Sequence, residues 1–341
     1  MKHKTSVGEF LKLYGIIIVL VVLLTVFSLL NPNFLTVNNL FELLKQVAFL
    51  GIISVGVTFC MLTAGIDLSV GSNMALSIVM TAIVIQAMPF GDAAGANVAL
   101  ACIVGVGMTT CIGLINGFFI NEIKIPPLIV TLAMLQIVRG LVFIVTGAIP
   151  VYKNIPKGFL FLGQGSISII PFPVIVMVVI FIIGTVVLGK TVYGRHVYCV
   201  GGNEEVARLS GINVRMLKYS VYTISGFLAG IAGILLLSRM NSGQPRAATG
   251  YEIEAVTACV LGGVSMAGGL GRLWNVFFGV AIMGTLSYGL ISVGVNDFWQ
   301  QLIKGAVLLA AVGIDSMSRT RQMNLVELRR EEGKRKKEAD I

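Results

Sequence analysis

The sequence predicts an all-α fold, a polytopic transmembrane bundle of about ten helices, and three observations lead to this prediction. Of the 341 residues, 56% are hydrophobic and only 12% are charged, whereas a soluble globular domain has about 25% charged residues. The mean hydropathy is +0.92. Apolar runs close to the length of about 20 residues that crosses the hydrocarbon core recur along the whole chain.

Nine apolar segments pass, or nearly pass, this test of length. In order they are Tyr14–Leu30, Val47–Ala64, Val70–Met88, Ala96–Gly117, Pro126–Gly147, Pro171–Leu188, Tyr219–Leu237, Trp274–Val293 and Trp299–Ile314. A tenth segment, Glu254–Gly268, is interrupted by glycines and is the weakest. The first segment follows basic residues as in a signal peptide, but no small-residue cleavage site follows it, so we expect it to be retained.

Basic residues outnumber acidic ones by 25 to 16, and they gather near the N-terminus, in the loop 189–218 and in the tail 319–341. Cytoplasmic loops of membrane proteins are enriched in Lys and Arg. We therefore expect this loop and both termini to be cytoplasmic, which requires an even number of spans. Ten spans satisfy this, and six would also do so if several segments were re-entrant. The expected domains are a transmembrane domain, residues 1–318, and a basic cytoplasmic tail, residues 319–341. The tail lacks interleaved aromatic residues, so no nucleic acid is expected as a partner.

Two short segments resemble each other across the chain. Val57–Leu62 is followed by the polar run Thr63–Ser72, and Val256–Leu261 is followed by the glycine-rich run Gly262–Gly271. Matched interruptions in two hydrophobic halves are typical of a transporter whose substrate path lies between repeats. The match is short, so a chance similarity is the alternative.

Polar side chains within or beside the spans are the candidates for a substrate path. Asp67, Ser69 and Asn73 follow the first of these interruptions. An ionisable residue among apolar spans is costly and suggests a function, and the alternative is that Asp67 caps the helix that begins near Ser69. Gln136 and Arg139 lie inside a predicted span. Arg139 needs a partner, for which Asp67 is one candidate, unless its side chain snorkels to the interface.

The loop 189–218 contains a short predicted helix. Asn203 is placed to cap this helix, Glu204 and Glu205 stand in its first turn, and Gly211 follows its end. A short capped helix between two spans forms an ordered surface that a cytosolic partner can bind. The alternative is an ordinary ordered loop.

The segment Gly184–Thr191 matches the phosphate-binding pattern GxxxxGK[ST]. That chemistry requires a loop between a buried strand and a helix, whereas the first half of this segment lies in a predicted span. We therefore expect no nucleotide site here, and we expect Lys190 to lie at the membrane interface. The five cysteines have no metal-ligand spacing, and no nucleophile is paired with a base. No metal, cofactor or enzymatic activity is expected.

Together these motifs resemble those of a known family, the permease subunits of bacterial ATP-binding-cassette (ABC) sugar importers, in the branch for ribose, xylose and galactosides. The resemblance covers nearly the whole chain. The segments that carry it are Asn31–Leu40, Leu62–Ser72, Pro127–Gly140, Gly201–Val214 and Gly262–Arg272. The sequence departs from the family in its longer, more basic tail after Arg319.

The resemblance implies a multi-pass transport subunit in the bacterial plasma (inner) membrane. It implies a permease homodimer in the lipid bilayer, bound to cytosolic ATPase subunits that hydrolyse ATP. It also implies an extracytoplasmic sugar-binding protein that delivers a ribose-type pentose or a related sugar. Glu205, Ala207 and Gly211 match the family's E-x-A-x-x-x-G spacing. The residues expected in the ATPase-coupling loop are Asn203, Glu204, Glu205, Ala207, Arg208 and Gly211. The alternative is a stand-alone secondary transporter or channel, which would need coupling carboxylates in its spans, and few are present.

Overall fold

The computed structural model describes residues 7–87, 94–152 and 155–317, and this part of the chain is predominantly helical. Its helices are α1 (Val7–Leu30), α2 (Val37–Leu62), α3 (Val70–Ala87), α4 (Ala94–Asn121), α5 (Pro127–Thr146), η1 (Lys157–Leu160), α6 (Phe161–Gln164), α7 (Phe172–Lys190), α8 (Val192–Gly202), α9 (Glu204–Leu209), α10 (Val214–Met240), α11 (Tyr251–Leu261), α12 (Leu273–Ser292) and a last helix over residues 297–317. One hairpin pairs β1 (Ser166–Ile167) with β2 (Ile170–Pro171) in antiparallel fashion. The predicted all-α, polytopic class is confirmed, while the tail 319–341 lies outside the described residues.

Among the described residues, seven helices are long and apolar enough to cross a membrane: α2, α3, α4, α5, α7, α10 and α12. In α1 the apolar part is shorter, Gly15–Leu30. The predicted segment Glu254–Gly268 is not one helix, because α11 ends at Leu261 and residues 262–272 are not helical. With 11 residues, α11 is about 16 Å long, which is roughly half of the hydrocarbon core.

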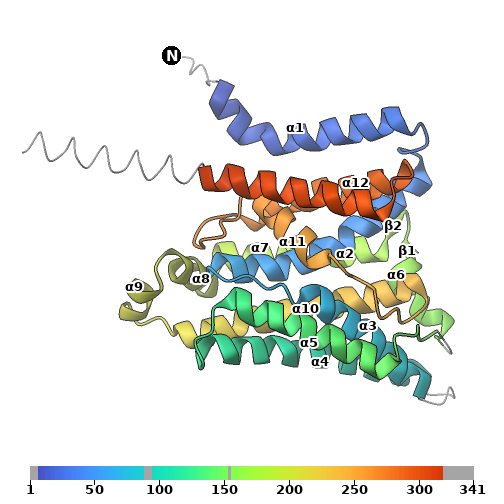
Figure 1. Cartoon of the computed structure of the whole chain (residues 1–341), viewed down its shortest axis with the longest axis horizontal. Coiled ribbons are helices and arrows are strands. Elements are labelled where there is room, and N and C mark those ends of the chain that lie inside the picture. Colours follow the sequence, from blue (N-terminus) through green and yellow to red (C-terminus); the bar gives the residue numbers. More distant parts are fainter. Residues whose placement is uncertain (1–6, 88–93, 153–154, 318–341) are drawn as a thin grey trace, which may run out of the picture.

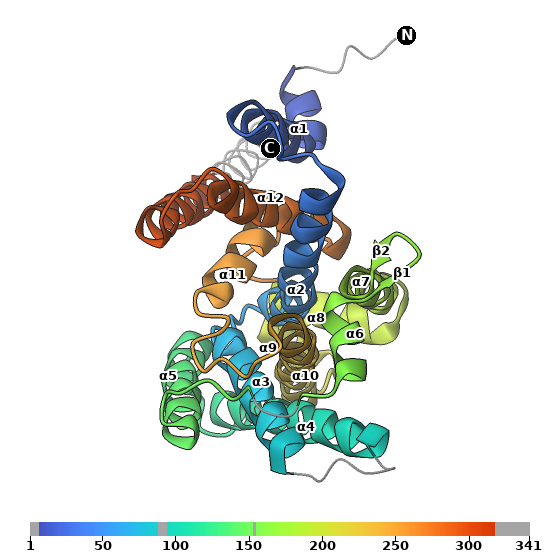
Figure 2. The ribbon, with the colours of Figure 1, turned by 90° about the vertical axis from the view of Figure 1, so that its right-hand side faces the viewer.

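The helices divide into an inner and an outer group. In Figure 2, α2 and α10 run through the middle of the bundle, with α1 at one edge and α4 at the opposite edge. The most apolar stretches of α2 and α10 are 83% and 72% buried, whereas those of α4, α5 and α7 are 22% to 28% buried. The outer helices are also more hydrophobic than α2 and α10. This order fits a lipid solvent, because lipid tails accept apolar side chains on the outside.

Glycines allow the inner helix α10 to approach α4 closely. A Cβ atom at Gly226 or Gly230 of α10 would overlap α4 at Thr109, and one at Gly113 of α4 would overlap the α10 backbone at Tyr222. Small residues at such contacts are typical of helix packing in membranes. These two helices are therefore fixed against each other along much of their length.

The two ends of the bundle differ. Figure 1 shows α8 and α9 at one end, together with the start of α1 and the end of helix 297–317, whereas α6 and the β1–β2 hairpin lie at the other end. Prolines stand at the first turns of α5 and α7, where a missing N–H costs little. The predicted loop 189–218 is thus mostly helical and forms a compact projection from one end of the bundle.

Candidate functional site

Two junctions between helices lie in the interior of the bundle. Residues 63–69 connect α2 to α3, and residues 262–272 connect α11 to α12. The second residue of each junction is in the left-handed conformation, at the equivalent position of the predicted repeat: Ala64 has φ +59° and Gly263 has φ +78°. The sequence similarity between the two segments therefore corresponds to a similar backbone.

The hydrogen bonds at the start of the two junctions also match. The Gly65 N–H donates to the Cys60 carbonyl at 3.0 Å, and the Val264 N–H donates to the Cys259 carbonyl at 3.0 Å. Bonds of this kind close a helix at its C-terminus by satisfying its last carbonyls. Both helices therefore end in the same way inside the protein.

The two junctions touch each other. The Thr58 hydroxyl of α2 lies 3.3 Å from the Cys259 sulfur of α11, and the Cys259 thiol donates to the Ser54 carbonyl at 3.4 Å. The Gly269 N–H of the second junction donates to the Leu62 carbonyl at the end of α2, at 3.0 Å. A movement of one junction therefore acts directly on the other.

The structure brings Asp67, Ser69 and Asn73 together in one buried network. Asp67 Oδ1 accepts hydrogen bonds from the Ser69 N–H at 2.9 Å and from the Ser69 hydroxyl at 2.6 Å. The Ser69 oxygen in turn accepts from the side-chain amides of Asn73 at 3.2 Å and of Asn116 on α4 at 3.0 Å. All four residues are fully buried. The carboxylate thus meets the start of α3, the geometry that we considered as the alternative to a path residue.

This network keeps free acceptors. Among the described residues, Asp67 Oδ2, Asn73 Oδ1 and Asn116 Oδ1 are buried without a hydrogen-bond partner. An unpaired buried polar atom is costly. Asn116 was missed at the sequence level, because an asparagine near the end of a long apolar helix gives no local signal.

Gln136 and Arg139 point in different directions from α5. Gln136 is exposed on the outside of the bundle. Arg139 Nη1 donates to the carbonyls of Pro245 and Ala247 at 3.1 and 2.9 Å. The suggested pairing of Arg139 with Asp67 is wrong, because the guanidinium donates instead to the loop between α10 and α11. The carbonyls of this loop accept the hydrogen bonds that a charged side chain within a span would otherwise make to water.

A second polar site lies at the start of α11. Lys304 Nζ forms an ion pair with Glu254 Oε1 at 2.6 Å, and the Ser287 hydroxyl donates to Glu254 Oε2 at 3.2 Å. Beside them is a pocket of about 390 Å³, which Glu252 and Gln301 also line. The sequence held a signal for this site, because Lys304 is an ionisable residue inside the predicted span Trp299–Ile314.

At the projecting end, α9 has the local structure that the sequence predicts. The Val206 N–H donates to Asn203 Oδ1 at 3.0 Å, so Asn203 caps the helix. Gly211 has φ +83° and turns the chain after the helix. Lys218 Nζ forms an ion pair with Glu204 at 2.7 Å.

The faces of α9 differ in exposure. Ala207 is 3% exposed and packs against its own chain, whereas Val206 and Leu209 are 57% and 81% exposed. Glu205 and Arg208 are exposed as well. A partner would therefore meet Val206 and Leu209, which the sequence reasoning missed, and Ala207 would instead let α9 lie close to the bundle.

The segment Gly184–Thr191 lies almost wholly in a helix. Gly184 to Lys190 form the last turns of α7, and the Thr191 hydroxyl accepts from the Gly194 N–H at 3.2 Å as the cap of α8. The backbone N–H groups that a phosphate loop would present are used inside these helices. The resemblance to a phosphate-binding pattern therefore corresponds to a helix end.

Glycines connect α8 to the second junction and to the end of α2, where a Cβ at Gly201 would overlap the Leu62 oxygen. A Cβ at Gly268 would lie 2.7 Å from the Ala64 nitrogen and 2.8 Å from the Gly201 oxygen. A Cβ at Gly269 would lie 2.8 Å from the Gly202 nitrogen. The last turn of α8, which leads into α9, is thus in backbone-to-backbone contact with the interior of the bundle.

Comparison with known proteins places the chain among transport proteins. Residues 39–312 match a family described as branched-chain amino acid transport system / permease component. No solved structure matches the chain.

Individual relatives are similar over almost their full length. The ribose import permease protein RbsC of Bacillus subtilis is 42% identical over 91% of this chain and 92% of that protein. The RbsC protein of Escherichia coli K12 is 40% identical over 88% of this chain and 92% of its own length. The L-arabinose transport system permease protein AraH of the same strain is 38% identical over 92% and 93%. With its apolar helices and these relatives, the chain is a multi-pass inner-membrane protein that belongs to this family of transport-system permease components.

Proposed function

We propose that this chain is the membrane permease subunit of an ABC importer and forms the translocation path for a monosaccharide, a ribose-type pentose or a related sugar. The support is the similarity to permeases named for ribose and L-arabinose. Its proposed partners are an ATP-binding-cassette ATPase, an extracytoplasmic sugar-binding protein and a second copy of the permease. The chain itself is a transport subunit and not an enzyme in this proposal, because the ATPase partner hydrolyses ATP.

The proposed topology has ten crossings with both termini in the cytoplasm. The start of α1 and the end of helix 297–317 lie at the same end of the bundle as α9 (Figure 1), which supports an even number. In this count α11 and residues 262–272 together make one crossing. The positive charge of the loop 189–218 supports the cytoplasmic side for that end, and the domain of residues 1–318 with its tail follows the same assignment.

The observation that carries this proposal is the contact between α8 and the two junctions. Energy supplied by an ATPase has to enter through a rigid element, because a flexible loop would dissipate the movement. Gly201 is buried at the end of α8, and the neighbouring glycines leave no side chain between α8 and the junctions. Movement of α9 would therefore be transmitted through α8 to the end of α2 and to the second junction.

The path residues stay a prediction. Asp67, Ser69 and Asn73 are buried in this conformation, so they would meet a sugar only after the two junctions separate. Their free acceptors suit the hydroxyl groups of a sugar. Gln136 is exposed on α5, and Arg139 supports the loop before α11. We therefore assign neither residue a direct contact with the sugar.

A stand-alone secondary transporter is the second candidate, and the geometry favours it less. Such a protein uses carboxylates in its spans to couple ions. Here Glu254 is paired with Lys304, and Asp67 meets the start of α3.

The test is to change α9 and its following turn. Replacing Gly211, at φ +83°, with Val should strain the backbone by about 1–3 kcal/mol and misplace α9. Glu205→Ala should remove an exposed side chain that is proposed to contact the ATPase. We expect both variants to insert and to bind the sugar-binding protein, but to lose co-purification of the ATPase or to hydrolyse ATP without sugar uptake in vesicles.

Two matched variants act as controls. Gly294→Val creates the same strain at φ +77° in the turn after α12, away from α9, and should leave coupling intact. Gly211→Asn should largely retain coupling, because Asn tolerates the left-handed conformation. If Gly211→Val and Glu205→Ala retain the ATPase and transport at the wild-type rate, α9 is not the coupling element.

A further inference from the structure

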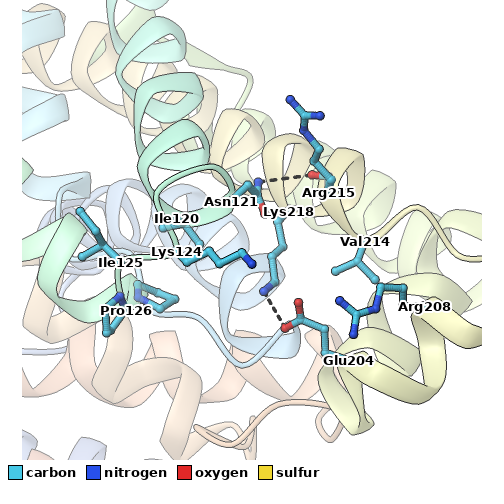
Figure 3. A pocket seen from close by; sticks show the side chains of 11 residues that line it. Ile120, Asn121, Lys124, Ile125, Pro126, Glu204, Arg208, Val214, Arg215 and Lys218 are labelled. Carbon is cyan, nitrogen blue, oxygen red and sulfur yellow. Dashed lines mark hydrogen bonds and ion pairs between the residues drawn. The ribbon is translucent and has the colours of Figure 1, made fainter.

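A pocket of about 460 Å³ lies where α4, α5, α9 and α10 meet at the projecting end of the bundle. Its lining comes from the end of α4, the turn into α5, one side of α9 and the start of α10 (Figure 3). The residues are Ile120, Asn121, Lys124, Ile125, Pro126, Pro127, Glu204, Arg208, Val214, Arg215 and Lys218. Glu204 and Arg208 also belong to the expected coupling loop, whereas the other lining residues have no part in the proposed transport function.

The pocket carries an excess of positive charge. Four basic residues and one acidic residue line it. Lys218 is paired with Glu204 at 2.7 Å, and Arg215 is paired with Glu122, outside the pocket, at 2.5 Å. Within the part of the chain that the structure describes, neither Lys124 nor Arg208 forms an ion pair with a carboxylate. Their charges are available for an anion from outside the chain.

The backbone at Lys124 supports a binding role. Lys124 has φ +59°, a conformation that a lysine rarely adopts. Strained positions of this kind tend to occur at ligand sites. In Figure 3 the ends of Lys124, Lys218 and Arg208 point into the pocket near Glu204.

The opposite wall of the pocket is apolar. Ile125, Pro126 and Pro127 form it, and nearby in the chain Phe118 of α4, Ile123 of the turn, and Leu128 and Ile129 of α5 are exposed. These two helices cross the membrane and end here. A ligand with one anionic and one apolar part, held at the boundary of the bilayer, fits both walls better than a small soluble anion does.

We propose that this pocket binds the phosphate group of an anionic membrane lipid, between Lys124 and Arg208, with the acyl chains against α4 and α5. Basic pockets at the ends of transmembrane helices are suited to such head groups. A bound lipid would connect α9 to the turn before α5. The proposal requires only that the chain lies in a bilayer, and Lys124, which is not in the coupling loop, allows it to be tested without a change in α9.

The test uses the full-length chain in detergent, titrated with dioleoylphosphatidylglycerol or dioleoylphosphatidylcholine, with bound lipids counted by native mass spectrometry. Lys124→Asn removes the charge but keeps a residue that tolerates the left-handed backbone, and it lies outside the coupling loop. Each basic residue near an anionic lipid contributes about fivefold to affinity. We therefore expect a roughly fivefold loss of phosphatidylglycerol affinity in Lys124→Asn and roughly 25-fold in Lys124→Asn with Arg208→Gln. Lys190→Asn removes an exposed charge at the same end of the molecule but outside the pocket, and it should leave lipid binding in the pocket unchanged.

Several outcomes would overturn the proposal. Equal phosphatidylglycerol binding by the wild type and the double variant would show that the pocket does not hold the lipid. Displacement of the lipid by inorganic phosphate at equal concentration would make it a site for a soluble anion. Loss of the ATPase partner with unchanged lipid binding would make it a protein contact.

Discussion

The two junctions begin with the same backbone but are held in place by different means. The first junction is held by side chains: the N–H and the hydroxyl of Ser69, at the start of α3, donate hydrogen bonds to Asp67. In the second junction, glycines at 268 and 269 bring the backbone against α2 and α8. The position of the first junction therefore depends on side-chain hydrogen bonds, and that of the second depends on residues without a side chain. Substitutions should therefore fail for different reasons in the two halves.

The largest effect is expected for Gly269→Ala in the second junction. The new Cβ would lie 2.8 Å from the Gly202 nitrogen, and φ is +71°. Left-handed strain costs about 1–2 kcal/mol, and overpacking adds about 1–3 kcal/mol. We expect little monodisperse protein in fluorescence-detected size-exclusion chromatography and a clear fall in the melting temperature.

Gly263→Ala is the matched control for this variant. Gly263 has φ +78° with nothing within 4 Å of a new Cβ, so only the strain of about 1–2 kcal/mol remains. Ala64 already adopts this conformation at the equivalent position. If both alanine variants were equally stable, backbone contact would not be what holds the second junction.

An intermediate effect is expected in the first junction. Asp67→Ala removes the acceptor of the Ser69 N–H and hydroxyl, which should cost about 1–3 kcal/mol because these groups are buried. Asp67→Asn keeps an oxygen for both bonds, so it should express within about twofold of the wild type by the same argument, while sugar uptake in vesicles falls. Normal uptake by Asp67→Asn would restrict Asp67 to capping α3, and equal melting temperatures for the two variants would contradict the hydrogen-bond network.

The smallest effect, with the opposite sign, is expected for Ala64→Gly. Ala64 is exposed at φ +59°, and glycine relieves this strain while adding entropy to the unfolded chain. The net result should be a gain of less than about 1 kcal/mol, measured as a small rise in melting temperature. A fall would show that the Ala64 methyl group makes a contact of its own, since Gly268 lies close to it.

Local rules in the sequence were sufficient for much of the fold. Apolar length marked the long spans, and the cap at Asn203 with Gly211 located α9. The resemblance of Val57–Leu62 to Val256–Leu261 marked both junctions. Each of these signals lies within a few residues of the structure that it predicts.

The remainder depends on contacts between distant residues, which no local pattern encodes. The partners of Arg139 are carbonyls in a loop about 100 positions later. Gly201 carries no sign that it meets Gly268, and a glycine-containing stretch such as Val192–Gly202 looks like a loop until the bundle packs against it. Likewise α11 is short because residues 262–272 must reach both α2 and α8.

Two thiols stand at equivalent places where α2 and α11 end, and this has a practical consequence. Cys60 and Cys259 are buried, whereas Cys111 and Cys199 are exposed and Cys102 is partly exposed. With those three replaced by serine, a maleimide added from water would react only while the junctions are apart, since a thiol must be reached to be alkylated. The labelling rates of Cys60 and Cys259 would therefore report how often the inner helices separate, measured with and without ATP in the complex with the proposed ATPase partner.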